Sequence, residues 1–149
     1  MLKEILSVSG KSGLFKLISQ GKNMFIAESL IDHKRIPVYM RDKVVSLGDI
    51  SIYTENEDIP LGKVLRKIKE KQNGEAIDFD AASITPEELK EWFAGILPDF
   101  DKQRVYPSDI KKLMSWYNIL VGEGLTDFEE KEEGEENPES EKREEQTKK

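Results

Sequence analysis

The chain has 149 residues, no cysteine, one histidine and a formal net charge of −7. Without cysteine it forms no disulfide, performs no thiol catalysis and holds no cysteine-based zinc or iron–sulfur site. Lys3 and Glu4 interrupt any apolar leader, and no stretch approaches the roughly 20 apolar residues of a membrane span, so we expect a cytoplasmic protein that does not enter a membrane.

The charge changes sign along the chain. Residues 1–71 carry 13 basic and 9 acidic side chains, residues 72–126 carry 5 and 10, and residues 127–149 carry 5 and 11. Phe128 is the only large apolar side chain of the last segment. Such a segment buries too little apolar surface to offset the entropy of ordering it, so we predict a disordered acidic tail over residues 127–149.

Short apolar runs separated by turn residues predict a β-rich unit over residues 4–59. A last hairpin is expected around Gly48 and Asp49. The expected strands are residues 5–9, 14–19, 24–27, 36–40, 44–46 and 50–53. So many short strands favour a small antiparallel β-barrel of SH3-like size or a bent sheet, because closure or bending protects the strand edges.

A helix is predicted to start at Asp58-Ile59-Pro60, where Asp58 suits the cap and the proline suits the first turn. Its apolar side chains recur at i, i+3, i+4 and i+7, and we expect this stripe to pack on the sheet. The stripe consists of Leu61, Val64, Leu65 and Ile68. The sequence from Gln72 to Glu75 breaks the pattern, and there we place the boundary of a first domain, residues 1–71.

Residues 72–126 are predicted to form a helical hairpin. Thr85 and Glu88 make a capping box, with Pro86 at the first helical position, and the helix they start is ended by Pro98. A second helix begins at residue 107 or 108 and stops at residue 122. The whole prediction is an α+β protein: a β-rich domain with one helix, a two-helix unit and a disordered tail.

The sequence Gly10-Lys11-Ser12 after a strand invites comparison with a phosphate-binding loop. That motif needs a glycine five residues before the Gly-Lys pair, and this position is Ile5, so we predict an ordinary hairpin turn. The alternative is an enzyme acting on a small phosphorylated substrate, which requires Lys11 and Ser12 to line a pocket. We predict that the protein is not an enzyme and needs no cofactor.

Three further patterns are tested as metal or catalytic sites and fail. Around Asp99 and Asp101, the glycine and the bidentate glutamate of a calcium loop are replaced by Arg104 and Ile110. Asp78 and Asp80 have no third convergent ligand. His33 lies beside an aspartate, but neighbours in an extended segment point to opposite faces, so a surface loop is expected. We predict no metal site.

Basic side chains offer candidate contact surfaces. The candidate interaction residues are Lys63, Arg66, Lys67, Lys69, Lys71, Arg41, Lys43 and Trp116. Trp116 falls beside the apolar stripe of its helix, and exposed tryptophan is enriched at interfaces. We expect a non-enzymatic adaptor with a protein partner; the alternative is a nucleic-acid-binding regulator that uses the basic face of residues 63–71.

Two parts of the chain resemble a family of small bacterial proteins known as a domain of unknown function. The first resemblance lies in the run ILSVSGKSGLFKL, residues 5–17, and the run RDKVVSLGDI, residues 41–50. The second part, from Arg104-Val105-Tyr106 to Trp116-Tyr117-Asn118, is similar to the helical domain that accompanies it. The resemblance implies a bacterial origin and a recurrent pairing of the two units, and it brings no catalytic residues.

Overall fold

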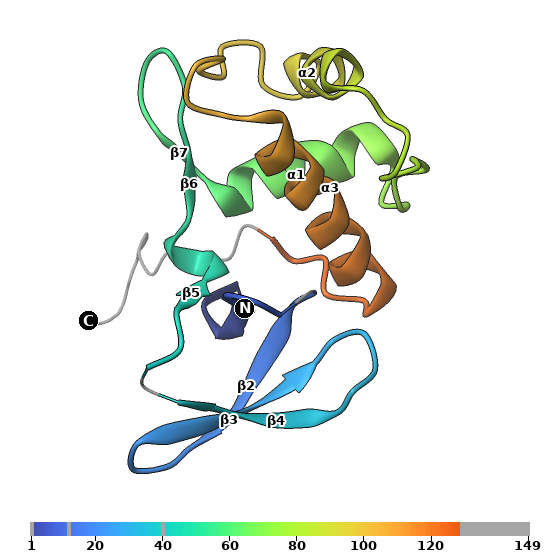
Figure 1. Ribbon diagram of the computed structural model, residues 1–149. Helices are drawn as coiled ribbons and strands as arrows, with labels where there is room; N and C mark the ends of the chain where they lie inside the picture. Colours follow the sequence, from blue (N-terminus) through green and yellow to red (C-terminus); the bar gives the residue numbers. More distant parts are fainter. Residues whose placement is uncertain (1, 12, 40, 129–149) are drawn as a thin grey trace, which may run out of the picture.

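The computed structural model describes residues 2–11, 13–39 and 41–128, and it confirms the α+β class. An antiparallel sheet forms one end of the molecule and three helices form the other (Figure 1). The five strands of the sheet are arranged in the order β4-β3-β2-β1-β5. The two edge strands do not pair with each other, so the predicted barrel is wrong and the sheet is open.

The sheet strands are short, as the sequence predicts. They are β1 (Ile5–Val8), β2 (Phe15–Gln20), β3 (Met24–Ser29), β4 (Arg35–Tyr39) and β5 (Val44–Ser46). The first four follow one another as hairpins, whereas β5 returns to pair with β1, with Val44 opposite Val8. This long-range pairing places the end of β1 in the interior of the sheet.

The predicted hairpin around Gly48 and Asp49 is wrong. The Ser46 hydroxyl accepts a hydrogen bond from the Gly48 N–H and caps a 3-10 turn over Leu47–Asp49, which redirects the chain away from the sheet. Strand β6 (Ser51–Ile52) therefore pairs with β7 (Ile59–Pro60) in a separate two-stranded ladder. Because Ile59 and Pro60 belong to that ladder, α1 starts at Leu61, with Pro60 as its N-cap and no side-chain cap.

The helices are α1 (Leu61–Gln72), α2 (Pro86–Ala94) and α3 (Pro107–Gly122). All four residues of the predicted α1 stripe are buried. Asn73 ends α1 in the left-handed conformation, and the predicted capping box of α2 is present, with Thr85 and Glu88 exchanging hydrogen bonds. Helix α2 ends at Ala94, one turn before Pro98.

One apolar core runs through the middle of the molecule. It joins Ile5, Leu14 and Leu30 of the sheet part to the α1 stripe and to the apolar faces of α2 and α3. Helix α1 packs mainly against α3, the 3-10 turn and the β6–β7 ladder rather than on the five-stranded sheet. The core therefore has members on both sides of residue 71, and the domain boundary predicted there stays a prediction.

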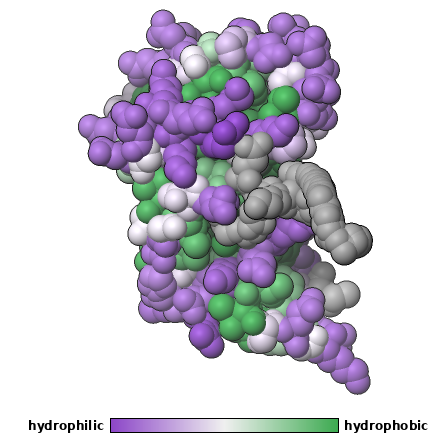
Figure 2. Space-filling model, turned by 180° about the vertical axis from the view of Figure 1, so that it is seen from behind, coloured by the Kyte–Doolittle hydropathy of each residue, from purple (hydrophilic) through white to green (hydrophobic). Residues whose placement is uncertain are grey.

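A second, smaller cluster lies within the sheet. Its buried members are Val8, Phe15, Ala27 and Val38. Seen from behind, apolar side chains are visible across the middle of the molecule and again at its lower end, while hydrophilic side chains dominate the upper, helical end (Figure 2). No helix within residues 2–128, apart from the undescribed positions 12 and 40, is long and apolar enough to cross a membrane.

The chain after α3 packs back on the helices. Leu125 N–H donates to the Leu120 carbonyl, and the Lys69 ammonium donates to the Thr126 carbonyl at 3.1 Å. Phe128, which the sequence places in the tail, is buried at 3 % exposure with its ring centroid 5.9 Å from that of Tyr117. The rest of the predicted tail, residues 129–149, lies outside the described residues.

Candidate functional site

A groove of about 670 Å³ opens between the sheet and the helices. One wall comes from the end of β1 and the turn that follows it, Ser7 to Lys11 with Gly13. The opposite wall comes from α3, and the segment from Ile84 to Leu89 at the start of α2 closes one side. The groove is therefore assembled from segments about 100 residues apart in the sequence.

The α3 wall follows from helical spacing. Ser108, Lys111, Lys112, Ser115 and Ile119 recur at intervals of three and four residues, so they share one face of the helix. That face lies beside the buried stripe, which begins at Ile110 and Leu113 and holds α3 in the core. Trp116, at the edge of this stripe, is half-buried: it packs against the core and also lines the groove.

The β1 wall follows from the alternation of a strand. Ser7 shares a face with Ile5, which is buried in the core, so the same face continues past the core into the groove. Lys11 sits in the tight turn between β1 and β2, where Gly10 and Gly13 have φ values of 84° and 83° that favour glycine. Lys11 therefore lines the groove, whereas Ser12 lies outside the described residues.

The groove is cationic. Its lining contains three lysines, Lys11, Lys111 and Lys112, and no aspartate or glutamate. Within the described part of the chain, none of these three ammonium groups has an ion-pair partner. The groove thus presents positive charge that the surrounding protein leaves unneutralised.

Apart from two glycines and two prolines, the remaining lining residues fall into two chemical groups. The hydroxyl-bearing residues are Ser7, Ser9, Ser108 and Ser115. The large apolar side chains are Val8, Ile84, Leu89, Trp116 and Ile119. An occupant would therefore meet ammonium groups, hydroxyl groups and an apolar surface together, a combination suited to a ligand with both acidic and apolar groups.

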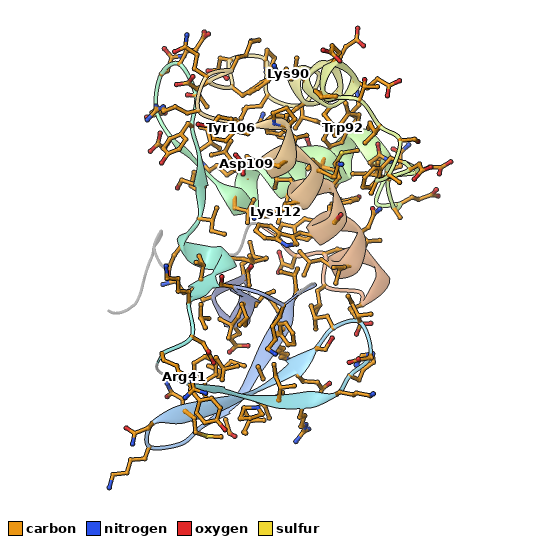
Figure 3. The ribbon with its side chains drawn as sticks, in the orientation of Figure 1. Arg41, Lys90, Trp92, Tyr106, Asp109 and Lys112 are labelled. Carbon is orange, nitrogen blue, oxygen red and sulfur yellow. The ribbon has the colours of Figure 1, made fainter. Side chains whose placement is uncertain are left out.

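A smaller cavity of about 230 Å³ adjoins the groove. Lys112 and Trp116 line both, so these two side chains form the partition between them. Figure 3 shows Lys112 near the centre of the molecule, on the same helix as Asp109. On the far wall the Arg104 guanidinium lies 4.0 Å from the ring centroid of Tyr53.

Arg104 is held in place by Asp101. Its Nε donates to the Asp101 carboxylate at 2.9 Å. This hydrogen bond, together with one from the Gln103 N–H, holds the pKa of Asp101 below its ordinary value. Asp101 thus pairs within its own loop, and Phe100 between the two aspartates is fully buried.

The predicted basic residues do not form one surface. Lys63, Arg66 and Lys67 are exposed on α1, at the helical end, and Arg66 pairs with Glu70 at 3.3 Å. Arg41 lies at the sheet end of the molecule, with its guanidinium 4.8 Å from the ring centroid of Tyr39 (Figure 3). Lys43 follows it in the connection to β5, Lys69 binds the Thr126 carbonyl, and Lys71 is exposed on the last turn of α1.

One signal for the groove is present in the sequence. The spacing of Ser108, Lys111, Lys112 and Ser115 indicates a polar face with two lysines and no acid, and it was open to sequence reasoning. The approach of Lys11 to that face was not, because it depends on how the β1–β2 turn packs against α3.

The remaining polar motifs have structural partners. His33, at a positive φ of 62°, lies 3.5 Å from Glu28 and 3.4 Å from Glu123, so it bridges the β3–β4 turn and the end of α3. The Asp80 carboxylate accepts a hydrogen bond from the Ala82 N–H. Over the described ranges, no three histidine, aspartate or glutamate side chains are grouped so that they could hold a metal ion.

The fold and groove define a small α+β protein with an open sheet joined to a helical unit. Its residues 2–47 match a family model described as "Domain of unknown function (DUF5606)", and residues 50–120 match "Domain of unknown function (DUF6852)". The resemblance found in the sequence is therefore confirmed. A comparison with curated proteins finds no match.

A solved structure provides a close relative. It is the solution NMR structure of a protein from Bacteroides vulgatus, a structural genomics target, with 52 % sequence identity and a TM-score of 0.72. The match covers 86 % of this chain and 91 % of that chain. The chain thus belongs to the same family as the Bacteroides protein, and it is built from these two domains of unknown function.

Proposed function

We propose that the protein is a non-enzymatic interaction protein of the cytoplasm, and that its groove binds an acidic, partly apolar segment of a partner protein. The observation that supports this proposal is the set of three lysines in a groove that contains no carboxylate. Bringing a chain with glutamate or aspartate side chains into this groove neutralises charge that the protein itself leaves unpaired. The apolar side chains around Trp116 then exclude water from the contact.

The lining residues favour binding over catalysis. A serine acts as a nucleophile only with a base within hydrogen-bond reach, which histidine, a carboxylate or a lysine supplies. The groove has four serines, neither histidine nor a carboxylate in its lining, and, among the described residues, no hydrogen bond between one of these serines and one of its lysines. Its chemistry is therefore that of recognition: three ammonium groups for anionic groups, hydroxyls for hydrogen bonds and an apolar wall for contact area.

The experiment measures binding of the full chain to a short fluorescent peptide of alternating glutamate and leucine. Fluorescence anisotropy is recorded at low and at physiological salt, beside a lysine–leucine peptide of equal length. We expect the acidic peptide alone to bind, with an affinity that falls as salt screens the lysines. A failure of the acidic peptide to bind at low salt would overturn the proposal.

A pair of variants locates the site. Lys111→Glu combined with Lys112→Glu should weaken binding by roughly tenfold or more, since it removes two attractive contacts and adds repulsion. Lys63→Glu combined with Lys67→Glu makes the same change of charge on α1 and should leave the affinity nearly unchanged. Equal losses in both variants would show a general effect of net charge and contradict the groove.

The same assay tests nucleic acid as the occupant. A fluorescent single-stranded oligonucleotide is titrated beside the acidic peptide, with both pairs of variants. Binding of the oligonucleotide in place of the peptide, abolished by the α1 variant, would replace this proposal by a nucleic-acid-binding regulator that uses residues 63–71.

A further inference from the structure

We propose that an acidic segment of this same chain, residues 129–136, binds in the groove and competes with the partner. The inference rests on the proposed function of the groove, and it adds a regulator of that site. The segment reads EEKEEGEE, with six glutamates and one lysine, which makes it the densest run of one charge in the sequence. Its charge is complementary to the three unpaired lysines of the groove.

The described part of the chain brings this segment to α3. Residue 128 is fixed, because the Phe128 ring packs against Tyr117 and its carbonyl lies against Gly62 of α1. Tyr117 directly follows Trp116, which lines the groove. The segment therefore starts from the same helix that forms the groove wall, on another side of that helix.

The segment is long enough to reach the lysines. Lys112 precedes Tyr117 by five residues, which is about 8 Å along the helix axis at 1.5 Å per residue. The helix with its side chains is about 10–12 Å across. Eight residues span up to about 28 Å when extended, so the chain can pass around α3 and place glutamates beside Lys111 and Lys112.

Tethering makes weak contacts effective. A segment joined to its site by a short connection acts at an effective concentration of the order of millimolar. The ion pairs that three exposed lysines can make are individually weak, so at this concentration the segment fills the groove in up to about half of the molecules. A partner must displace the segment. The apparent affinity of the partner is therefore its intrinsic affinity multiplied by the fraction of molecules in which the groove is empty.

The basic face of α1 is the competing location for the segment. Two of its cations have partners, since Arg66 pairs with Glu70 and Lys69 donates to the Thr126 carbonyl. Lys63, Lys67 and Lys71 have no ion-pair partner within the described residues. The three groove lysines have no ion-pair partner within the described residues. The groove differs from this face because its three lysines line one cavity that contains no carboxylate, and this enclosure favours the groove.

The first test is carbodiimide cross-linking of the full chain, which joins carboxylates and ammonium groups in direct contact. Peptide mapping of the monomeric product should show links from residues 129–136 to Lys111, Lys112 or Lys11. Links confined to α1, links found only in covalent dimers, or no links from residues 129–136 would overturn the proposal. This result does not depend on whether the peptide probe binds.

The second test is the affinity for the glutamate–leucine peptide. Replacing the six glutamates of residues 129–136 by glutamine in the full chain should raise the affinity by up to about twofold. The matched control replaces Glu139, Glu141, Glu144 and Glu145 by glutamine and should leave it unchanged. Equal affinity of all three chains would refute the competition by residues 129–136 and leave the proposed function intact. If the peptide binds none of the three chains while the cross-links still form, the proposed acidic partner is refuted and the binding of residues 129–136 in the groove stands.

Discussion

Phe128 is a core residue in the structure, although the sequence predicts that it lies in the disordered tail. A phenylalanine side chain buries roughly 150–250 Å², which at about 25 cal/mol per Å² corresponds to roughly 4–6 kcal/mol. Measured costs of Phe→Ala in protein cores are about 3–5 kcal/mol, and an unfolded chain already buries part of this area. Because Phe128 is 3 % exposed but lies near the end of the packed chain, we expect Phe128→Ala to cost about 3 kcal/mol.

The assay is urea unfolding followed by circular dichroism, with a thermal melt beside it. A loss of this size lowers the melting temperature of a chain of this length by roughly 10 °C. Tyr106→Ala is the control, because Tyr106 is 60 % exposed and its truncation should change stability by no more than about 0.5 kcal/mol. A loss below about 1 kcal/mol for Phe128→Ala would refute the reasoning.

Truncation separates the packed segment from the rest of the tail. Ending the chain after residue 128 should leave the free energy of unfolding unchanged within about 0.5 kcal/mol. Ending it after residue 126 removes Phe128 and should reproduce the loss expected for Phe128→Ala. Equal stability of the two truncated chains would show that Phe128 contributes nothing to the core.

Three further predictions concern single contacts. Thr85→Ala removes the capping box of α2 and should cost about 1 kcal/mol in urea unfolding; a neutral result would contradict the cap. Asn118→Leu leaves the N–H and C=O of Ile77 without their partners at 2.7 and 2.9 Å and should cost about 2 kcal/mol, whereas a gain in stability would show that apolar burial outweighs these bonds. The lowered pKa of Asp101 stabilises the fold above its ordinary pKa of 3.8, and this contribution is lost as the pH falls through the folded-state pKa. Asp101→Asn should therefore lower the melting temperature near neutral pH and converge with the unchanged protein in acid, while a difference independent of pH would contradict the role of the Arg104 pair.

The helical features were predictable because they depend on neighbours in sequence. The α1 stripe repeats within seven residues, and the Thr85–Glu88 capping box closes within three. Both features depend on residues only a few positions apart, so the apolar stripe was sufficient to predict α1 and the capping box was sufficient to predict the start of α2. The start of α1 was misplaced because Ile59 pairs with Ile52, a contact that competes with the local helix signal.

The strands show where such reasoning ends. The sequence located each apolar run but not the strand that pairs with β5. Val44–Ser46 could pair with the segment after the next turn or with the edge of β1, which lies 36 residues earlier in the chain. The Ser46 cap decides between them by turning the chain after Leu47. The sheet is therefore open rather than a closed barrel, because its edge strands β4 and β5 lie at opposite sides of the sheet and do not pair with each other.

The sequence by itself determined the α+β class, the presence of the three helices, the capping box of α2, the absence of cysteine chemistry and the division of charge. Only the tertiary structure decided that Lys11 approaches Lys111 and Lys112 in one groove, and that Phe128 belongs to the core. The reason is physical: helix caps and stripes are set by contacts within a few residues, whereas a groove depends on which distant surfaces the whole core brings together.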